Sequence, residues 1–219
     1  MQNHFGKGFA FHREGVFIVS LPLLTLAFNL IRPATPFQLV VASISIFLIA
    51  PFLIARFIFQ KNIRFLGFKK GFLGRGLLGV IIGWLIFLPI MNLVAGQKEF
   101  QTMYPPFSVM RESLAAFLFF EVLVFLPIFF AVQTFLFGYA YNGLKKMIGR
   151  SKTALLLSFI LIPLFYFSRP PIEIVLSSFV AFFTCWINAR GRSILYPILF
   201  GWGLSMILDA LVLQKIFLP

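Results

Sequence analysis

The chain of 219 residues is 60% apolar and only 11% charged, and it carries a formal net charge of +13. Soluble proteins average about 25% charged residues, so this chain has too few polar side chains to cover a water-exposed surface. With 32 phenylalanines and a single cysteine, Cys185, the composition also excludes a disordered chain and a disulfide-stapled secreted domain. It predicts a single membrane domain over residues 1–219.

Seven apolar stretches follow one another along the chain. They cover residues 15–31, 36–59, 76–96, 113–141, 153–167, 171–188 and 193–213. A helix that crosses a bilayer needs about 20 apolar residues, and only the fifth stretch, which contains Pro163, is clearly short of this length. The pattern predicts an all-α, polytopic transmembrane helix bundle of about seven spans, with residues 1–14 as a cytoplasmic N-terminal tail.

The basic residues cluster between alternate apolar stretches. If the N-terminus lies inside, 14 of the 19 lysines and arginines fall in inside regions. Because cytoplasmic loops of membrane proteins are enriched in lysine and arginine, this asymmetry predicts an N-in, C-out orientation. It also explains the net charge without nucleic acid as a partner, since no polar domain with base-reading elements accompanies the charge.

A basic segment at 56–76 interrupts the N-terminal spans, which occupy residues 15–96. It interleaves phenylalanine with lysine and arginine, as an interfacial helix or a tight loop does when its rings lie at the acyl boundary. Its cations would then contact lipid phosphates, which makes anionic headgroups of the bilayer an expected partner. The expected contacts are made by Arg56, Lys61, Arg64, Lys69 and Lys70.

Small residues recur at helical spacing in two of the stretches. Gly79 and Gly83 form a GxxxG pattern in the third stretch, and Ser177, Ala181 and Cys185 form a stripe on the sixth. Such patterns let helices approach closely. We expect packing within this bundle, and the alternative is contact with other membrane-protein subunits.

Acidic residues inside the bilayer are costly, so each one needs an explanation. Glu121 lies in the fourth stretch and Asp209 in the seventh, and the predicted orientation puts both in the outer half of the membrane. They could share a pocket, a proton or an ion, or each could be satisfied within the bundle. Glu173 follows Arg169 by one helical turn, which predicts an ion pair at the interface.

Gln133 is the other deeply placed polar residue. A buried amide without a partner costs about 1–3 kcal/mol. We therefore expect it to form a hydrogen bond with a nearby side chain; the candidate partners are Ser205, Ser158 and Thr134.

The sequence offers little for metal or nucleophilic chemistry. Catalytic zinc normally takes three protein ligands, but the two histidines, His4 and His12, both lie in the N-terminal tail. The same lack of a base in the membrane argues against a Ser–His nucleophile, and no phosphate-binding glycine motif is present. We therefore expect no catalytic residue, no metal site and no cofactor.

Two motifs in the second half resemble those of a known family. The fourth stretch ends in AVQTFLFGYAYNGLKKMIGRSK (131–152), and the last begins with RGRSILYPILFGWGLS (190–205). Over residues 113–213 the chain resembles the CAAX-protease and bacteriocin-processing (CPBP, or Abi) intramembrane metalloproteases. That family has a glutamate pair followed by F-R-G-Y, a short helix with a histidine, and a final helix with a histidine and Asn or Asp.

The departures from this family fall on its catalytic residues. Val132 and Gln133 replace the glutamate pair, Phe137 replaces the arginine, and Gly201 and Ser205 replace the ligands of the last helix. The resemblance therefore implies a pseudoenzyme that has lost zinc and proteolysis. It would keep a cytosol-facing cavity, lined by Gln133, Gly201, Gly203 and Ser205, which binds a partner helix, a peptide or a lipid.

Two functions from other classes remain open. The chain could be an accessory or structural subunit of a larger membrane complex, or a small transporter that uses Glu121 and Asp209. In each case we expect an integral protein of the inner (cytoplasmic) membrane of a bacterium or an archaeon.

Overall fold

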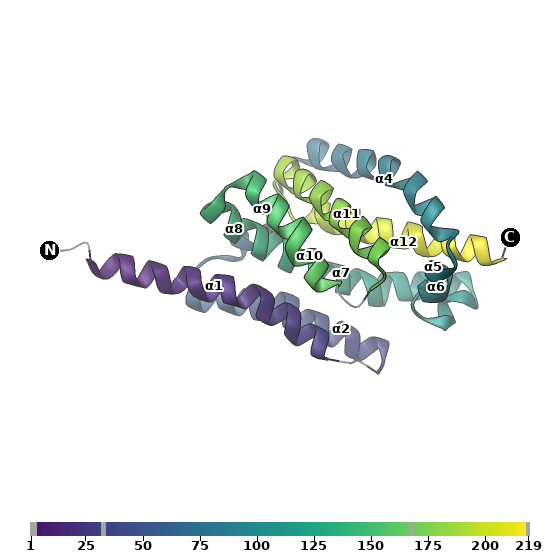
Figure 1. The fold of residues 1–219 in the computed structure, drawn as a ribbon, viewed down its shortest axis with the longest axis horizontal. Helices are drawn as coiled ribbons and strands as arrows, with labels where there is room; N and C mark the ends of the chain where they lie inside the picture. Colours follow the sequence, from purple (N-terminus) through teal and green to yellow (C-terminus); the bar gives the residue numbers. More distant parts are fainter. Residues whose placement is uncertain (1–3, 32–33, 167–168, 218–219) are drawn as a thin grey trace.

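A computed structural model describes residues 4–31, 34–166 and 169–217, and the side chains of these residues from Glu14 onward. Within these ranges the protein is almost entirely helical and has no strand (Figure 1). The all-α prediction is therefore confirmed for the part of the chain that the structure describes.

In the described residues the longer helices group into seven segments, and three short helices lie in the connections between them. The first two are α1 (His4–Leu30) and the run α2 (Pro36–Ile44), η1 (Ser45–Ile49), α3 (Ala50–Leu53) and η2 (Ile54–Ile58). After the short turn η3 (Ile63–Leu66) come α4 (Leu73–Ala95), α5 (Lys98–Met103) and η4 (Ser108–Arg111). The longest segment comprises α6 (Leu114–Phe120), η5 (Glu121–Phe125), α7 (Leu126–Gln133), η6 (Thr134–Ala140) and α8 (Tyr141–Ile148). The last three are α9 (Arg150–Leu156) with η7 (Leu157–Leu161) and α10 (Ile162–Phe165), then α11 (Pro171–Gly191) and α12 (Leu195–Phe217).

Five of these segments are long and apolar enough to cross a membrane, among the residues described. They are Pro36–Ile58, Leu73–Ala95, Leu114–Ile148, Pro171–Gly191 and Leu195–Phe217. The other two predicted spans coincide with shorter helices: the apolar part of α1, Glu14–Leu30, has 17 residues, and the segment 150–165 is shorter still. The described residues thus form a helix bundle with five candidate membrane spans, as expected of an integral membrane protein.

Prolines explain three of the π-helical turns. Pro51, Pro127 and Pro163 have no backbone N–H, so each removes one α-helical hydrogen bond inside its segment. In each case the N–H of the preceding residue bonds to the carbonyl five residues back: Ala50 to Ser45, Leu126 to Glu121, and Ile162 to Leu157. The wider turn keeps the helix continuous, which satisfies the backbone inside an apolar medium.

The 114–148 segment runs through the middle of the bundle. The α2 run packs against it on one side and α12 on the other, while α4 packs outside α11 and α12 (Figure 1). It has 35 residues. At about 1.5 Å per residue its length is about 50 Å, which exceeds the roughly 30 Å thickness of a hydrocarbon core. We infer that its polar last part, α8, reaches beyond the apolar layer.

Aromatic contacts attach α1 to this central segment. The ring of Phe17 lies 5.1 Å from that of Tyr139, and the Tyr139 hydroxyl forms a 2.9 Å hydrogen bond with Ser20 Oγ. Gly143 faces the Phe17 ring so closely that a Cβ there would overlap it. Glycine at 143 therefore lets the two helices approach.

Candidate functional site

A central cavity of about 130 Å³ lies where α7, η6, α11 and α12 meet. Its wall is mostly apolar, with a few amide, hydroxyl and carboxyl groups. Besides the residues treated below, it is lined by Met91, Phe100, Phe129, Leu136, Ile162, Tyr166, Leu176, Val180, Thr184, Leu204 and Leu208. A cavity of about 150 Å³ is enough for one benzene-sized group, so this one has room for one apolar side chain.

The structure brings together the five residues that the sequence resemblance singled out. Val132 and Gln133 come from α7, Phe137 from η6, and Gly201 and Ser205 from α12, and all five line the central cavity. The convergence depends on Gly201, because a Cβ there would overlap the Gln133 side-chain nitrogen. Gly201 thus lets α12 approach the amide of Gln133.

The Gln133 amide oxygen has no hydrogen-bond partner among the described groups, although it is buried. The expectation that this oxygen bonds to Ser205, Ser158 or Thr134 is wrong. The hydroxyls of Ser158 and Thr134 are themselves buried and unpaired. The nitrogen of the same amide packs against the backbone of α12 at Gly201. The cavity therefore has an acceptor that lacks a donor.

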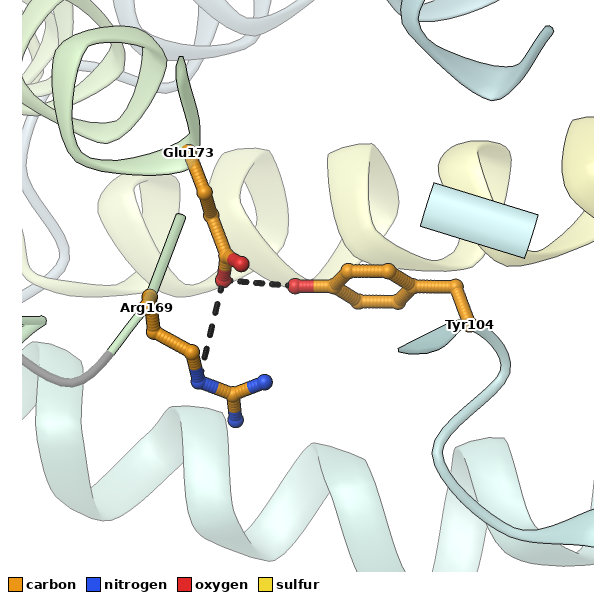
Figure 2. A network of polar contacts seen from close by, with 3 residues as sticks. All are labelled: Tyr104, Arg169 and Glu173. Atoms are coloured by element: carbon orange, nitrogen blue, oxygen red, sulfur yellow. Dashed lines mark hydrogen bonds and ion pairs between the residues drawn. The ribbon is translucent and has the colours of Figure 1, made fainter. Parts of the chain in front are cut away.

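The far end of the cavity carries a polar network (Figure 2). The Tyr104 hydroxyl donates a 2.7 Å hydrogen bond to Glu173 Oε1, and Arg169 Nε lies 4.0 Å from the same oxygen, as shown in Figure 2. The predicted Arg169–Glu173 ion pair is therefore confirmed. The second oxygen, Glu173 Oε2, is buried without a partner. It is the second unpaired acceptor on this wall.

Tyr104 contributes a hydroxyl that stays protonated. Burial, and then the neighbouring carboxylate of Glu173, raise the pKa of Tyr104 well above its ordinary value of about 10. The loop that carries it is held by Arg111, whose Nη2 donates to the carbonyls of Gln101 and Tyr104 at 3.0 and 3.1 Å. Tyr104 therefore remains a hydrogen-bond donor at physiological pH.

One expectation about the cavity needs correction. Gly203 does not line it; Gly203 faces Trp84, whose ring a Cβ would overlap. The lining also reaches Tyr104 and Glu173, which the sequence did not assign to the cavity.

The small-residue stripe on α11 splits between two roles. Ser177 and Ala181 line the central cavity, and Cys185 is buried in the apolar core next to them. On α4, Gly79 faces Ile187 and Trp186, and a Cβ on Gly83 would overlap the rings of Phe200 and Phe183. These glycines therefore lie where α4 packs against α11 and α12.

Glu121 and Asp209 lie side by side in the bundle, apart from the central cavity. Both are fully buried, at 0% and 1% exposure, and each is a direct neighbour of the other. No other described side chain donates a hydrogen bond to their four carboxyl oxygens, and the two carboxyl groups are close enough to share a hydrogen bond through one proton. The indole of Trp202 instead donates 3.1 Å to the backbone carbonyl of Glu121. The structure therefore brings the two acids together without supplying a counter-charge.

The basic segment folds back onto the bundle. Its five expected lipid contacts, Arg56, Lys61, Arg64, Lys69 and Lys70, are all exposed. Two of its rings pack on protein instead of pointing outward: Phe65 lies 6.4 Å from Tyr139, and Phe68 lies 5.6 Å from Phe130. Between η2 and α4 the segment is thus a loop with one 3₁₀ turn, which packs against η6 of the central helix.

No group of three or more His, Cys, Asp or Glu side chains that could hold a metal occurs among the residues described. The side chains of His4 and His12 lie outside the described part.

Sequence reasoning did not identify Tyr104 as a site residue, because Tyr104 belongs to no recognisable motif. Its only signal is its place in a proline-rich turn, YPP, between two apolar stretches.

Comparison with protein-family models, with curated proteins and with solved structures found no match to this chain.

Proposed function

We propose that this protein is a non-catalytic member of the CPBP type that binds a membrane-embedded peptide segment in its central cavity. In this proposal seven helices cross the inner membrane of a bacterium or an archaeon, with the N-terminus inside. The observation that carries the proposal is the pair of buried, unpaired acceptors on one apolar wall, Gln133 Oε1 and Glu173 Oε2.

The chemistry of these acceptors favours a peptide over a fatty acid. An unsatisfied buried acceptor costs about 1–3 kcal/mol, which a ligand recovers if it brings an N–H or O–H donor. Backbone amides and polar side chains of a peptide carry such donors, whereas a fatty-acid carboxylate would be repelled by Glu173. The cavity volume of about 130 Å³ suits one apolar side chain of that peptide.

Loss of catalysis follows from the residues that stand at the family's catalytic positions. Val132, Phe137 and Gly201 offer no side-chain group that can bind a metal or transfer a proton, and Gln133 and Ser205 offer no base. Stoichiometric zinc in protein that lacks residues 1–12, together with chelator-sensitive cleavage of a membrane substrate, would contradict this part of the proposal.

Site-directed photo-crosslinking in native membranes tests the binding role. A benzophenone amino acid at Ser205, on the cavity wall, should capture a discrete peptide adduct that mass spectrometry can identify. The same probe at Ala210, exposed on the same helix, is the control and should give no such adduct. The Ser205 adduct should also disappear when Ala181→Phe fills the cavity. Identical adducts from both positions would refute the proposal.

The acid pair supports a second candidate function, proton or cation binding. In an apolar interior two adjacent carboxylates repel each other strongly, so the pair must hold a proton or a cation. Glu121→Gln and Asp209→Asn should then abolish proton- or cation-coupled flux in proteoliposomes, whereas Glu99→Gln, outside the spans, should not. Equal flux in all the variants would remove this candidate.

A further inference from the structure

A second hollow, here called the basic pocket, lies near the α8 end of the central helix. Its volume is about 340 Å³, within the roughly 300–1,000 Å³ usual for ligand pockets. It is lined by Gly67, Lys69, Tyr141, Asn142, Lys145, Arg150, Asn188, Ala189 and Arg192. The basic pocket shares no lining residue with the central cavity.

Four cations from four separate segments converge on this pocket. Lys69 comes from the loop after η3, Lys145 from α8, Arg150 from the start of α9, and Arg192 from the turn between α11 and α12. None of the six acidic residues of the chain lines the pocket. The one ion pair among the described residues, Arg169–Glu173, lies at the opposite end of the bundle. The pocket therefore holds four positive charges without a protein counter-charge.

Backbone hydrogen bonds hold the walls of the pocket together. The Phe72 N–H donates 2.8 Å to the Gly191 carbonyl, and the Ile194 N–H donates 3.1 Å to the Gly67 carbonyl. These two bonds fasten the loop that carries Lys69 to the turn that carries Arg192. Gly67 has a φ of +89°, a conformation that glycine adopts without strain.

Two asparagine side chains complete the frame. Asn142 Nδ2 donates 3.0 Å to the Phe65 carbonyl and its Oδ1 accepts a 3.2 Å hydrogen bond from Lys145. Asn188 Nδ2 donates 2.8 Å to the Phe137 carbonyl. Both amides are thus occupied by the protein, which positions the pocket before a ligand arrives. A pre-organised site loses less conformational freedom on binding.

Basic residues at this end of the bundle also have a simpler explanation, because they follow the positive-inside rule. The chain contains basic residues that satisfy this explanation without lining the pocket. Three of the pocket cations have such a neighbour within two residues; these neighbours are Lys146, Lys152 and Arg190. Convergence on one hollow therefore distinguishes the four pocket cations from an ordinary basic end.

We propose that the basic pocket binds a phosphate group, carried either by the headgroup of an anionic phospholipid or by a small soluble phosphate. Arginine binds phosphate oxygens through two parallel hydrogen bonds, and lysine adds a point charge. The pocket lies beside the ends of α8 and α11, where the apolar helices give way to polar residues. That is the level of the headgroups in a bilayer.

Two charge-matched variants test the proposal on the full chain. The pocket variant carries Lys145→Gln, Arg150→Gln and Arg192→Gln, and the rim variant carries Lys146→Gln, Lys152→Gln and Arg190→Gln. Each lowers the net charge by the same amount at the same end of the bundle. Helical circular dichroism and monodisperse elution establish that both fold.

The probes are inorganic phosphate added to protein in phosphatidylcholine nanodiscs, and nanodiscs that contain phosphatidylglycerol in phosphatidylcholine. We expect a saturable rise in thermal stability with at least one probe, weakened at least about tenfold in the pocket variant and nearly unchanged in the rim variant. A response to inorganic phosphate assigns a soluble phosphate to the site, and a response to phosphatidylglycerol alone assigns a headgroup. Equal loss in both variants, or no saturable response in the wild type, overturns the proposal.

A second variant covers the case in which the pocket variant does not fold. Ala189→Glu keeps all four cations and adds a carboxylate to the pocket wall. It should suppress the response to both probes, while Gln97→Glu, which adds a carboxylate at an exposed position outside the spans, should not. A full response in Ala189→Glu would contradict the proposal.

Discussion

The central cavity and the basic pocket lie at different levels of the same helical segment, 114–148, and they differ in which polar atoms they leave without a partner. The cavity leaves two acceptors, Gln133 Oε1 and Glu173 Oε2, on an apolar wall. The pocket presents four cations and no carboxylate. The central cavity would take a ligand that donates hydrogen bonds, and the basic pocket would take an anion. The two proposed sites therefore favour ligands of different chemistry.

A side-chain hydrogen bond between helices connects the walls of the two hollows. The side chain of Phe137 lines the cavity, and its backbone carbonyl accepts the hydrogen bond of Asn188, which lines the pocket. In the CPBP-like arrangement that we propose, Phe137 takes the place of an arginine. A neutral residue there leaves the four cations of the basic pocket separated from the cavity by an uncharged wall. The two sites can therefore be tested one at a time.

The largest expected effect separates the pocket from the cavity. A Cβ at Gly138 would overlap the backbone carbonyl of Leu66, so Gly138→Ala must push the basic loop away from η6. We expect a loss of about 1–3 kcal/mol in the free energy of unfolding, measured by thermal denaturation in detergent. Phosphate binding should weaken because Lys69 moves with the loop, while crosslinking at Ser205 persists.

Gly74→Ala is the matched control for that substitution. Gly74 lies in α4 with no atom within 4 Å of an added Cβ, so alanine there should be neutral or stabilise the helix by about 0.5–1 kcal/mol. Equal destabilisation by the two substitutions would show that the loop does not depend on Gly138.

An intermediate effect is expected at the far end of the cavity. Tyr104→Phe removes the 2.7 Å hydrogen bond to Glu173 and leaves that buried carboxylate to Arg169 alone. The expected loss is about 1.5 kcal/mol, the low end for a hydrogen bond to a carboxylate, because Arg169 still faces this carboxylate. Thermal stability measures the loss, with Tyr196→Phe as control, because its 3.4 Å bond to the Lys70 carbonyl is weaker.

The pH dependence of the same bond has a definite sign. Since the pKa of Tyr104 is raised in the folded protein, the folded state holds this proton more tightly than the unfolded state does. The contribution is therefore complete below about pH 10 and falls as the pH rises further. The slope of stability against pH above that point should be smaller in Tyr104→Phe. An unchanged slope would argue against burial of this hydroxyl.

The smallest expected effect is a gain in stability. Gln133→Leu replaces an unpaired buried amide with an apolar group, which should stabilise the empty protein by about 1 kcal/mol. The same change should abolish the adduct captured at Ser205, because the ligand loses its acceptor. Thr134→Val is the control: its hydroxyl is equally buried and unpaired but does not line the cavity, so stability should rise while the adduct remains. Loss of the adduct in both variants would mean that Gln133 has no specific role.

The positions of the helices could be predicted well from the sequence. Long apolar runs give helices at all seven predicted stretches, because only a helix satisfies the backbone inside an apolar layer. Which of them are long enough to span was predicted less well: α1 has a short apolar part, and the segment around Pro163 is short. The wide turns before Pro51, Pro127 and Pro163 were not predicted, although each follows from a missing N–H.

The candidate site was predictable in part. The motif resemblance selected Val132, Gln133, Phe137, Gly201 and Ser205, and these residues line one cavity. The predicted place of Gly203 was wrong, because it depends on how α4 and α12 pack. Tyr104 was not predicted, since a loop residue gives no periodic signal.

The sequence by itself determined that this chain is a helical membrane protein, because helix formation and transfer into an apolar layer depend on windows of about 20 residues. Tertiary structure alone decided which polar atoms remain unpaired and which cations meet. Lys69, Lys145, Arg150 and Arg192 are far apart in the sequence and converge only because the loop, the central helix and the last turn pack together. Such hollows are what remains after distant side chains have filled the space between helices, and no local pattern specifies them.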